Sequence, residues 1–235
     1  MDFTPDRACA QRLDAQDELA PYRDRFVVDD ADLVYLDGNS LGRLPKATRE
    51  RLHEVVDREW GGQLIRSWNL GWMESSERVG GKLARLLGAR ADEVVVADST
   101  SVNLFKLAHA AVEARPGRRK VVTDDLNFPS DHYVLQGLAR ISGRPLELVV
   151  CRSPDGVHGP VHELAEAIDE DTALVTLSHT TYKTSYTYDM ASITALAERA
   201  GALALWDVSH SVGSLPIALN ACNAPLAVGC TYKHL

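Results

Sequence analysis

Short apolar runs alternate with longer segments of helical periodicity from residue 93 to the end of the chain. The apolar runs predict strands at 93–97, 119–123, 146–151, 172–177, 202–206 and 226–230. The segments between them predict helices at 102–114, 130–142, 160–169 and 189–200. This alternation is typical of an α/β domain with three α/β/α layers, in which helices cover both faces of a mostly parallel sheet.

Residues 1–92 follow a different pattern. The elements predicted there are a helical segment at 7–27 broken by Pro21, a strand at 33–36, a turn at 37–42, helices at 45–60 and 77–87, and a loop at 61–75. The loop contains Trp68 and Trp72, which either line a pocket or fill the edge of the core. We divide the chain into an N-terminal helical segment with its turn, 1–45, and a large domain, 46–235.

Composition removes several classes of protein from consideration. Apolar residues make up 45% of the 235 residues and charged residues 25%. No apolar run approaches the roughly 18 residues that a membrane span requires. The N-terminus is acidic and helical in pattern, unlike a secretory signal. We therefore expect no membrane partner and a cytoplasmic location.

Charge and cysteine spacing narrow the expectation further. The net charge is −8, and the only basic cluster, 115–120, reads as a solvated turn, so we expect no nucleic-acid partner. The four cysteines show neither CxxC spacing nor a pattern of metal ligands with histidine. We expect reduced thiols and no metal site.

The final stretch carries an acid and a lysine, each just after an apolar run. Asp207 follows the predicted strand 202–206, and Lys233 follows 226–230. The carboxyl ends of parallel strands meet at one edge of a sheet, where ligands bind. Pyridoxal phosphate (PLP) needs both groups, a lysine to hold its aldehyde as a Schiff base and an acid to keep its ring nitrogen protonated. The alternative is an ordinary salt bridge at a strand end.

Three more predicted strand ends carry polar or aromatic groups. Residues 98–103 place hydroxyls at the start of a helix, where they either bind an anion or cap the helix. Residues 128–133 offer an aromatic ring for stacking, or a hydrophobic staple with a cap. Residues 178–184 add further hydroxyls and an imidazole. Polar groups repeated at successive strand ends indicate a shared ligand site.

Two rival sites use some of the same residues. Asp207, Ser209 and His210 are the residue types of a hydrolase triad, but they are sequence neighbours and no GxSxG motif is present. His132, His179 and His210 could be metal ligands, but no HExxH motif accompanies them. Neither rival is favoured.

Several motifs together resemble those of kynureninases, PLP enzymes of the fold type I (aspartate aminotransferase) superfamily. The motifs are YLDGNSLG at 35–42, LIRSWNLGW at 64–72, DSTSVNLFK at 98–106, FPSDHY at 128–133, LSHTTYKT at 177–184, WDVSHSVG at 206–213 and CTYKHL at 230–235. The acid, histidine and lysine are shared with related desulfurases. GNSLG, FPSDHY and the Tyr-Lys pair at 182–183 are more specific to kynureninases.

The resemblance implies a role for each matching residue. Lys233, Asp207 and Tyr232 would be the catalytic residues. Lys233 would bind the cofactor covalently, and Asp207 would pair with the pyridine nitrogen. The other implied cofactor contacts are His210 beside the ring, Thr100, Ser101 and Tyr232 at the phosphate, Phe128 on the ring face, and Asp131 and Ser178. Ser40 and Trp68 would lie near the substrate.

The family reaction is hydrolysis of L-kynurenine or 3-hydroxykynurenine to anthranilate or 3-hydroxyanthranilate and L-alanine, in tryptophan catabolism and NAD biosynthesis. The resemblance also implies a homodimer. The sequence departs from the family at 184–186, where a small residue with glycine is usual, and it stops two residues after Lys233. We therefore expect an incomplete large domain, no small C-terminal domain, and an isolated chain without activity. The alternatives are another fold type I enzyme, such as a cysteine desulfurase, and a non-catalytic truncated subunit.

Overall fold

The protein is described by a computed structural model that covers residues 5–235. It divides into two compact units, one ending at Trp72 and one running from Met73 to Leu235. Each unit is described by itself below. The division at 45/46 that the sequence suggests stays a prediction.

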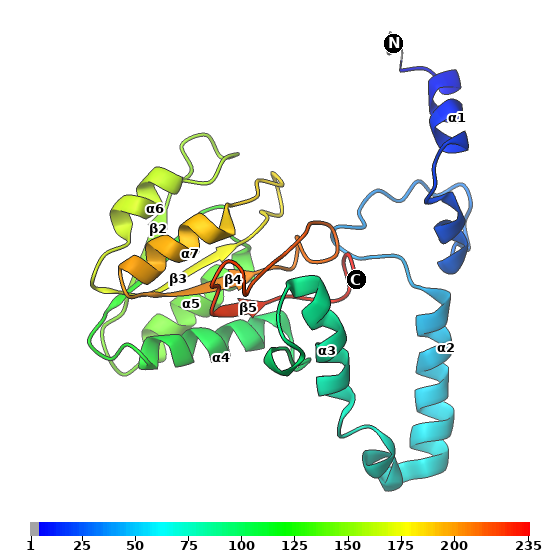
Figure 1. Cartoon of the computed structure of the whole chain (residues 1–235), viewed down its shortest axis with the longest axis horizontal. Helices are drawn as coiled ribbons and strands as arrows, with labels where there is room; N and C mark the ends of the chain where they lie inside the picture. Colours follow the sequence, from blue (N-terminus) through cyan, green and yellow to red (C-terminus); the bar gives the residue numbers. More distant parts are fainter. Residues whose placement is uncertain (1–4) are drawn as a thin grey trace. The chain divides into compact units, whose positions relative to one another are not determined.

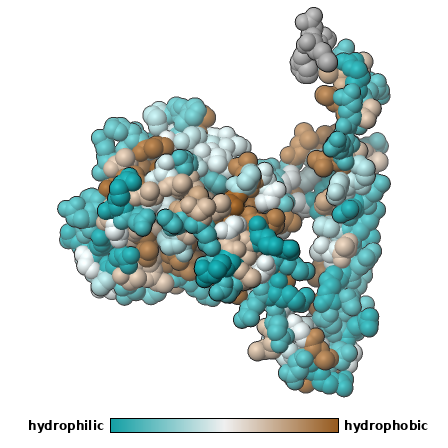
Figure 2. All heavy atoms as spheres, in the orientation of Figure 1, coloured by the Kyte–Doolittle hydropathy of each residue, from teal (hydrophilic) through white to brown (hydrophobic). Residues whose placement is uncertain are grey.

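The first unit is helical. It contains α1 (Arg7–Ala15), a 3₁₀ helix (Ala20–Arg25), α2 (Lys46–Glu54), a π-helical continuation (Val55–Gln63) and a second 3₁₀ helix (Leu64–Leu70). Figure 2 shows mainly hydrophilic residues along α2. The prediction of a loop at 61–75 is wrong, because helical turns cover residues 61–70.

The strand predicted at 33–36 is also wrong. Val34 and Leu36 are 77% and 87% exposed, and the only pairing that the first unit's described residues make is an isolated bridge between Phe26 and Pro45. A strand forms only where a neighbour accepts and donates its hydrogen bonds. Residues 33–36 have the composition of a strand and lack such a neighbour.

The second unit contains the alternating elements. They are α3 (Ser75–Leu87), a 3₁₀ turn (Ala91–Glu93), α4 (Thr100–Glu113), β1 (Lys120–Asp124), α5 (Pro129–Ile141), β2 (Glu147–Cys151), α6 (Val161–Ala167), β3 (Thr172–Ser178), α7 (Met190–Arg199), β4 (Leu203–Asp207) and β5 (Leu226–Val228). The strands form one parallel sheet in the order β2-β1-β3-β4-β5. Five of the six strands predicted after residue 92 are thus confirmed.

Helices cover both faces of this sheet, as Figure 1 shows for α4 and α5 on one side and α6 and α7 on the other. One apolar cluster joins α4 and α5 to the sheet and includes Leu104, Leu135 and Leu174. A second cluster joins α6 and α7 to the opposite face around Trp206. The predicted three-layer α/β/α architecture is confirmed.

The strand predicted at 93–97 does not form. A 3₁₀ turn occupies Ala91–Glu93, and residues 94–97 belong to no ladder among the described residues. Val95 and Val96 are 63% and 39% exposed. The apolar run has the right composition, but no neighbouring strand of the described chain pairs with it.

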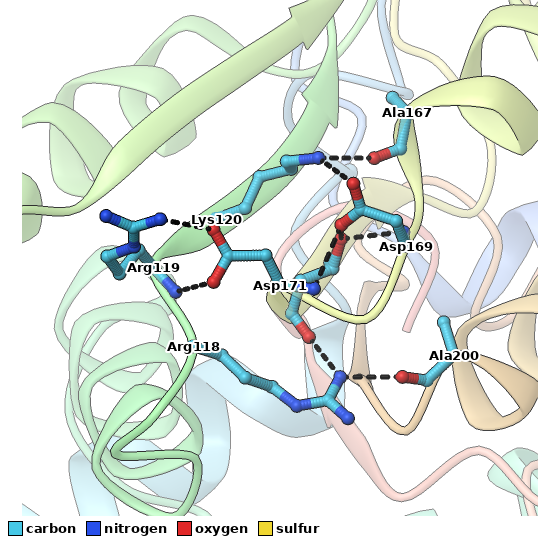
Figure 3. A network of polar contacts seen from close by, with 8 residues as sticks. Arg118, Arg119, Lys120, Ala167, Asp169, Asp171 and Ala200 are labelled. Atoms are coloured by element: carbon cyan, nitrogen blue, oxygen red, sulfur yellow. Dashed lines mark hydrogen bonds and ion pairs between the residues drawn. The ribbon is translucent and has the colours of Figure 1, made fainter.

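Polar contacts join the amino ends of β1 and β3, at the edge opposite the predicted site (Figure 3). The Arg118 guanidinium donates to the carbonyl oxygens of Thr172 and Ala200, each at 2.7 Å. Lys120 forms an ion pair with Asp169 and donates to a nearby backbone carbonyl. These contacts tie the amino ends of β1 and β3 together.

Candidate functional site at the carboxyl edge of the sheet

The carboxyl ends of three neighbouring strands form the centre of the candidate site. Ser178 ends β3 and Asp207 ends β4, and the two residues are partners in the ladder. Asp207 also pairs with Val228, the last residue of β5, and Lys233 lies in the segment that follows. This edge lies beside the point where the strand order reverses, between β1 and β3. Ligands of open parallel sheets bind at such a point.

Lys233 contacts an imidazole and two aromatic rings. Its Nζ donates to His210 Nε2 at 2.9 Å. Burial, together with the charges of Lys233 and His234, lowers the pKa of His210 to about 4, so the imidazole is neutral and accepts the hydrogen bond. The same Nζ lies 5.5 Å from the ring centre of Phe128 and 5.9 Å from that of Tyr232. The Lys233 amine is therefore held by a hydrogen bond to His210, and the rings of Phe128 and Tyr232 lie near it.

Phe128 is positioned by the start of α5. It is the N-cap residue, and Pro129 occupies the first turn of the helix. Its ring makes an edge-on contact with Tyr182, with the ring centres 5.0 Å apart. Tyr182 also lies 6.5 Å from the ring of His210. The sequence predicted a stacking role for Phe128 but none for Tyr182.

Asn127 is a second residue that the sequence reasoning missed. Its side chain is 3% exposed and accepts hydrogen bonds from Ser178 Oγ at 2.6 Å and from the Phe128 backbone amide at 2.9 Å. Its Nδ2 donates to Thr123 Oγ1 at 3.2 Å. The side-chain amide of Asn127 therefore links β1 to the end of β3. It also orients Ser178 and Phe128, two of the predicted cofactor contacts. The local signal was an Asn two residues before Pro129, since Asn side chains at turns accept hydrogen bonds from nearby backbone amides.

Two carboxyl groups of the predicted site are buried. Asp131 is 1% exposed and Asp207 is 5% exposed. Asp207 Oδ1 accepts from the Ser209 backbone amide at 2.8 Å, and Ser130 Oγ donates to Asp131 Oδ1 at 3.3 Å. Burial and the neighbouring Asp207 raise the pKa of Asp131 to about 7. Burial also raises the pKa of Asp207, against the lowering effect of the Ser209 hydrogen bonds and the charge of Lys233.

The start of α4 contributes hydroxyl groups. Ser99 is the N-cap residue and its side chain accepts from the Val102 amide. Thr100 Oγ1 donates to the Gly229 carbonyl at 3.2 Å, which ties the helix start to the segment carrying the lysine. Ser101 lies in the same first turn, half-buried. Capping and an anion site are therefore compatible here, because capping satisfies only some of the amides of the first turn.

Tyr232, Ser40 and Trp68 are the remaining predicted site residues. Tyr232 is 56% exposed beside the lysine. Ser40 and Trp68 belong to the first unit, where Ser40 Oγ donates to Asp37 Oδ1 at 2.8 Å and Trp68 packs edge-on against Trp72 with ring centres 5.8 Å apart. The roles assigned to these three residues stay predictions, as do those of the residues described above.

Comparison with known proteins identifies the family. The family described as aminotransferase class-V matches residues 34–234. The chain belongs to that family.

Similar proteins include the kynureninase of Pseudomonas fluorescens, which is 49% identical over 228 residues, covering 95% of this chain and 53% of that protein. The kynureninase of Burkholderia mallei is 45% identical over 231 residues, covering 96% of this chain and 54% of that protein. The chain therefore spans about half the length of the curated relatives it matches.

Solved structures share the fold at lower identity. The apo cysteine desulfurase of Thermococcus onnurineus NA1 gives a TM-score of 0.70 at 18% identity, covering 86% of this chain and 50% of that one. A C-DES mutant with glycine covalently linked to its PLP-cofactor gives 0.73 at 16% identity, covering 98% and 56%. These similarities show the fold.

None of the helices in the described part of the chain combines the length and apolar character needed to cross a bilayer.

Proposed function

We propose that this chain is part of a kynureninase that uses PLP to hydrolyse L-kynurenine or 3-hydroxykynurenine to anthranilate or 3-hydroxyanthranilate and L-alanine. The observation that carries the proposal is the 49% identity with the Pseudomonas fluorescens kynureninase over 95% of the chain. By the resemblance of its motifs, the proposal includes a homodimer, a cytoplasmic location, and a place in tryptophan catabolism and NAD biosynthesis.

The residues at the sheet edge fit PLP. Asp131 Oδ2 is buried and has no hydrogen-bond partner, so the site holds a buried polar atom that a polar group bound there could satisfy. The hydroxyls of Thr100 and Ser101, with the amides of the first turn of α4, have the chemistry of a phosphate site. Phe128 presents an aromatic ring close to Lys233. Donors, acceptors and aromatic surface therefore match the three parts of the cofactor.

The protein's own groups divide the work. When bound, PLP supplies an aldehyde that a lysine amine can capture and a ring that accepts electrons from the substrate. Lys233, once its amine is free, can hold or move the proton of the substrate's α-carbon. His210 is neutral and accepts a hydrogen bond from the Lys233 amine. This hydrogen bond orients Nζ without transferring its proton to the imidazole. Asp207 is buried and anchored by Ser209, so its carboxylate can keep a ring nitrogen protonated.

Tyr232 supplies a hydroxyl at the exposed side of the site. Burial and the nearby Cys230 raise the pKa of Tyr232, so its hydroxyl stays neutral and can donate to an anionic phosphate. Its ring lies 5.9 Å from Lys233 Nζ. The same residue therefore contacts the catalytic amine and offers a donor to the cofactor.

The decisive experiment identifies the residue that binds PLP. The protein expressed from its natural gene is mixed with PLP and reduced with borohydride, and the modified peptide is sequenced by mass spectrometry. We expect the label on Lys233 and no label in Lys233→Ala. Lys82→Ala changes an exposed lysine of α3 and is the matched control. Label at another lysine, or equal labelling of Lys233→Ala, would refute the assignment.

The substrate is tested separately. Anthranilate fluorescence on addition of kynurenine should appear with the protein expressed from its natural gene and fall at least about 100-fold when that protein carries Lys233→Ala, since a positioned acid or base contributes on the order of 100-fold or more. Sulfide release from cysteine without anthranilate formation would instead favour a desulfurase. Absence of any PLP absorbance would favour a non-catalytic subunit.

A further inference from the structure

Tyr182 contacts two of the groups that surround the lysine amine. Its ring lies edge-on to Phe128, with the ring centres 5.0 Å apart, and its ring centre lies 6.5 Å from that of His210. Lys233 Nζ in turn donates to His210 Nε2 at 2.9 Å and lies 5.5 Å from the ring centre of Phe128. Tyr182 therefore packs beside two neighbours of the amine, although the proposed chemistry gives it no role.

The turn that carries Tyr182 follows β3 and is closed by several hydrogen bonds. The Thr181 amide donates to the Tyr186 carbonyl at 2.9 Å, and the Ser185 amide donates to the Thr181 carbonyl at 3.0 Å. The Tyr186 amide also donates to Thr181 Oγ1 at 3.1 Å. Thr181 itself is 2% exposed. The backbone on both sides of Tyr182 is therefore fixed to the buried end of the strand.

Threonine hydroxyls hold this turn where the sequence departs from the kynureninase pattern, at 184–186. Ser185 has a φ of 58°, in the left-handed region that glycine adopts most readily. Thr184 Oγ1 donates its proton to the Val157 carbonyl at 2.9 Å, so in its 2.7 Å contact with Thr181 Oγ1 it is the acceptor. Hydroxyl contacts therefore keep a left-handed turn residue in place without glycine.

The ring of Tyr182, and not its hydroxyl, makes both contacts at the site. Aromatic rings with centres roughly 4.5–7 Å apart attract each other in edge-on and offset arrangements. Phe128 is also held through its backbone amide, which donates to Asn127 Oδ1 at 2.9 Å. The contact with Tyr182 adds a restraint on the Phe128 ring itself. The same ring lies beside the half-buried imidazole of His210.

We propose that Tyr182 is a positioning residue, whose ring holds Phe128 and His210 where they contact the Lys233 amine. In the cofactor-free protein the ring shields the imidazole that accepts from Nζ. With PLP bound, a step that rests on the proposed function, the ring keeps Phe128 in place as the stacking surface. The role requires an aromatic ring at position 182 and does not require the hydroxyl.

The titration of His210 reports the contact without any cofactor. Burial, and then the charges of Lys233 and His234, lower the pKa of His210 from 6.5 to about 4. Loss of the Tyr182 ring admits water to the imidazole and leaves both charged neighbours in the chain, so the pKa should rise. A group with a pKa of about 4 is only about 3% protonated at about pH 5.5, so a rise is easily detected there.

The test is nuclear magnetic resonance of ¹⁵N-histidine in the cofactor-free protein expressed from its natural gene. The His210 signal is assigned by its loss in His210→Gln. We expect the protonated fraction of His210 at about pH 5.5 to rise at least about fivefold in Tyr182→Ala and to stay unchanged in Tyr182→Phe. Tyr133→Ala, at a 69% exposed tyrosine of α5, is the matched control and should leave the signal unchanged.

The imidazole of His179, which is 7% exposed, serves as an internal reference for the turn. An unchanged His210 signal in Tyr182→Ala overturns the proposal, as does an equal rise in Tyr182→Phe. An equal rise at His179 would show general loosening and would overturn the specific role. If circular dichroism shows Tyr182→Ala to be unfolded, Tyr182→Leu replaces it. That variant keeps part of the apolar volume and should give a smaller rise, and no rise overturns the proposal.

PLP is then added to each protein and binding is followed by absorbance. Tyr182→Ala should bind PLP about two- to tenfold more weakly, the contribution of one aromatic pair, and Tyr182→Phe should bind it as the unaltered protein does. Unchanged affinity in Tyr182→Ala would overturn the role toward the cofactor. Absence of PLP binding to the unaltered protein would refute the proposed function instead. The His210 result is obtained without cofactor, so the two failures are distinguishable.

Discussion

The best-defined stability prediction concerns Asp124 and Tyr188, two buried residues joined by a hydrogen bond. Asp124 ends β1 with its side chain fully buried, and Tyr188 is 2% exposed. The Tyr188 hydroxyl donates to Asp124 Oδ2, while Oδ1 has no partner. Burial raises the pKa of Asp124 from 3.8 to about 6, and the Tyr188 hydrogen bond opposes the shift without cancelling it.

The magnitude follows from linkage. A carboxyl whose pKa is higher in the folded state stabilises the fold fully below its unfolded pKa, and this stability is lost as pH rises through the folded pKa. A shift from 3.8 to about 6 corresponds to about 3 kcal/mol of free energy of unfolding, lost between about pH 4 and pH 6. Asp124→Asn cannot ionise and should not show this loss. The free energy of unfolding of the variant relative to the unaltered protein should therefore rise by about 3 kcal/mol between about pH 4 and pH 8.

Urea denaturation followed by circular dichroism across that pH range measures the effect. The titration of Asp131 is common to both proteins and cancels in the difference. Glu113→Gln, at an exposed position of α4, is the control and should show no comparable change with pH. A difference between Asp124→Asn and the unaltered protein that stays constant with pH would refute the reasoning.

Three further predictions test the fold and the site. Arg118→Ala removes two hydrogen bonds from a charged donor and should lower the free energy of unfolding by about 2 to 4 kcal/mol in urea denaturation, with Arg118→Lys intermediate. Leu104→Ala, at a side chain with 0% exposure, should lower it by about 3 kcal/mol, and a loss below about 1 kcal/mol would contradict the packing described. Asn127→Ala removes the acceptor for Ser178 and Phe128 and should weaken PLP binding by about tenfold in an absorbance titration, while unchanged affinity would show that this link is not needed.

The three-layer architecture could be predicted from the sequence because its signals are local. The helix predicted at 102–114 is observed as α4 at Thr100–Glu113, capped by the side chain of Ser99. Caps and helical periodicity act within a few residues, so they can be read along the chain. The positions of Asp207 and Lys233 after apolar runs likewise indicated a site at the carboxyl edge of the sheet.

The failed strands show what local signals leave out. Residues 33–36 and 93–97 have the apolar composition of strands, but strand formation depends on a partner that is distant in sequence. In the described chain neither run has one. Composition shows which segments can join a sheet, and pairing decides which do.

The tertiary structure alone decided how the site's groups interact. The sequence marked Asp131 as a cap or a cofactor contact and Asp207 as a partner of the ring nitrogen. Only the fold buries both Asp131 and Asp207, which are 1% and 5% exposed, and only the fold brings Asn127 to Ser178. Residue types determine which protons and hydrogen bonds are available, whereas burial and distance, which depend on the whole fold, determine where a proton resides.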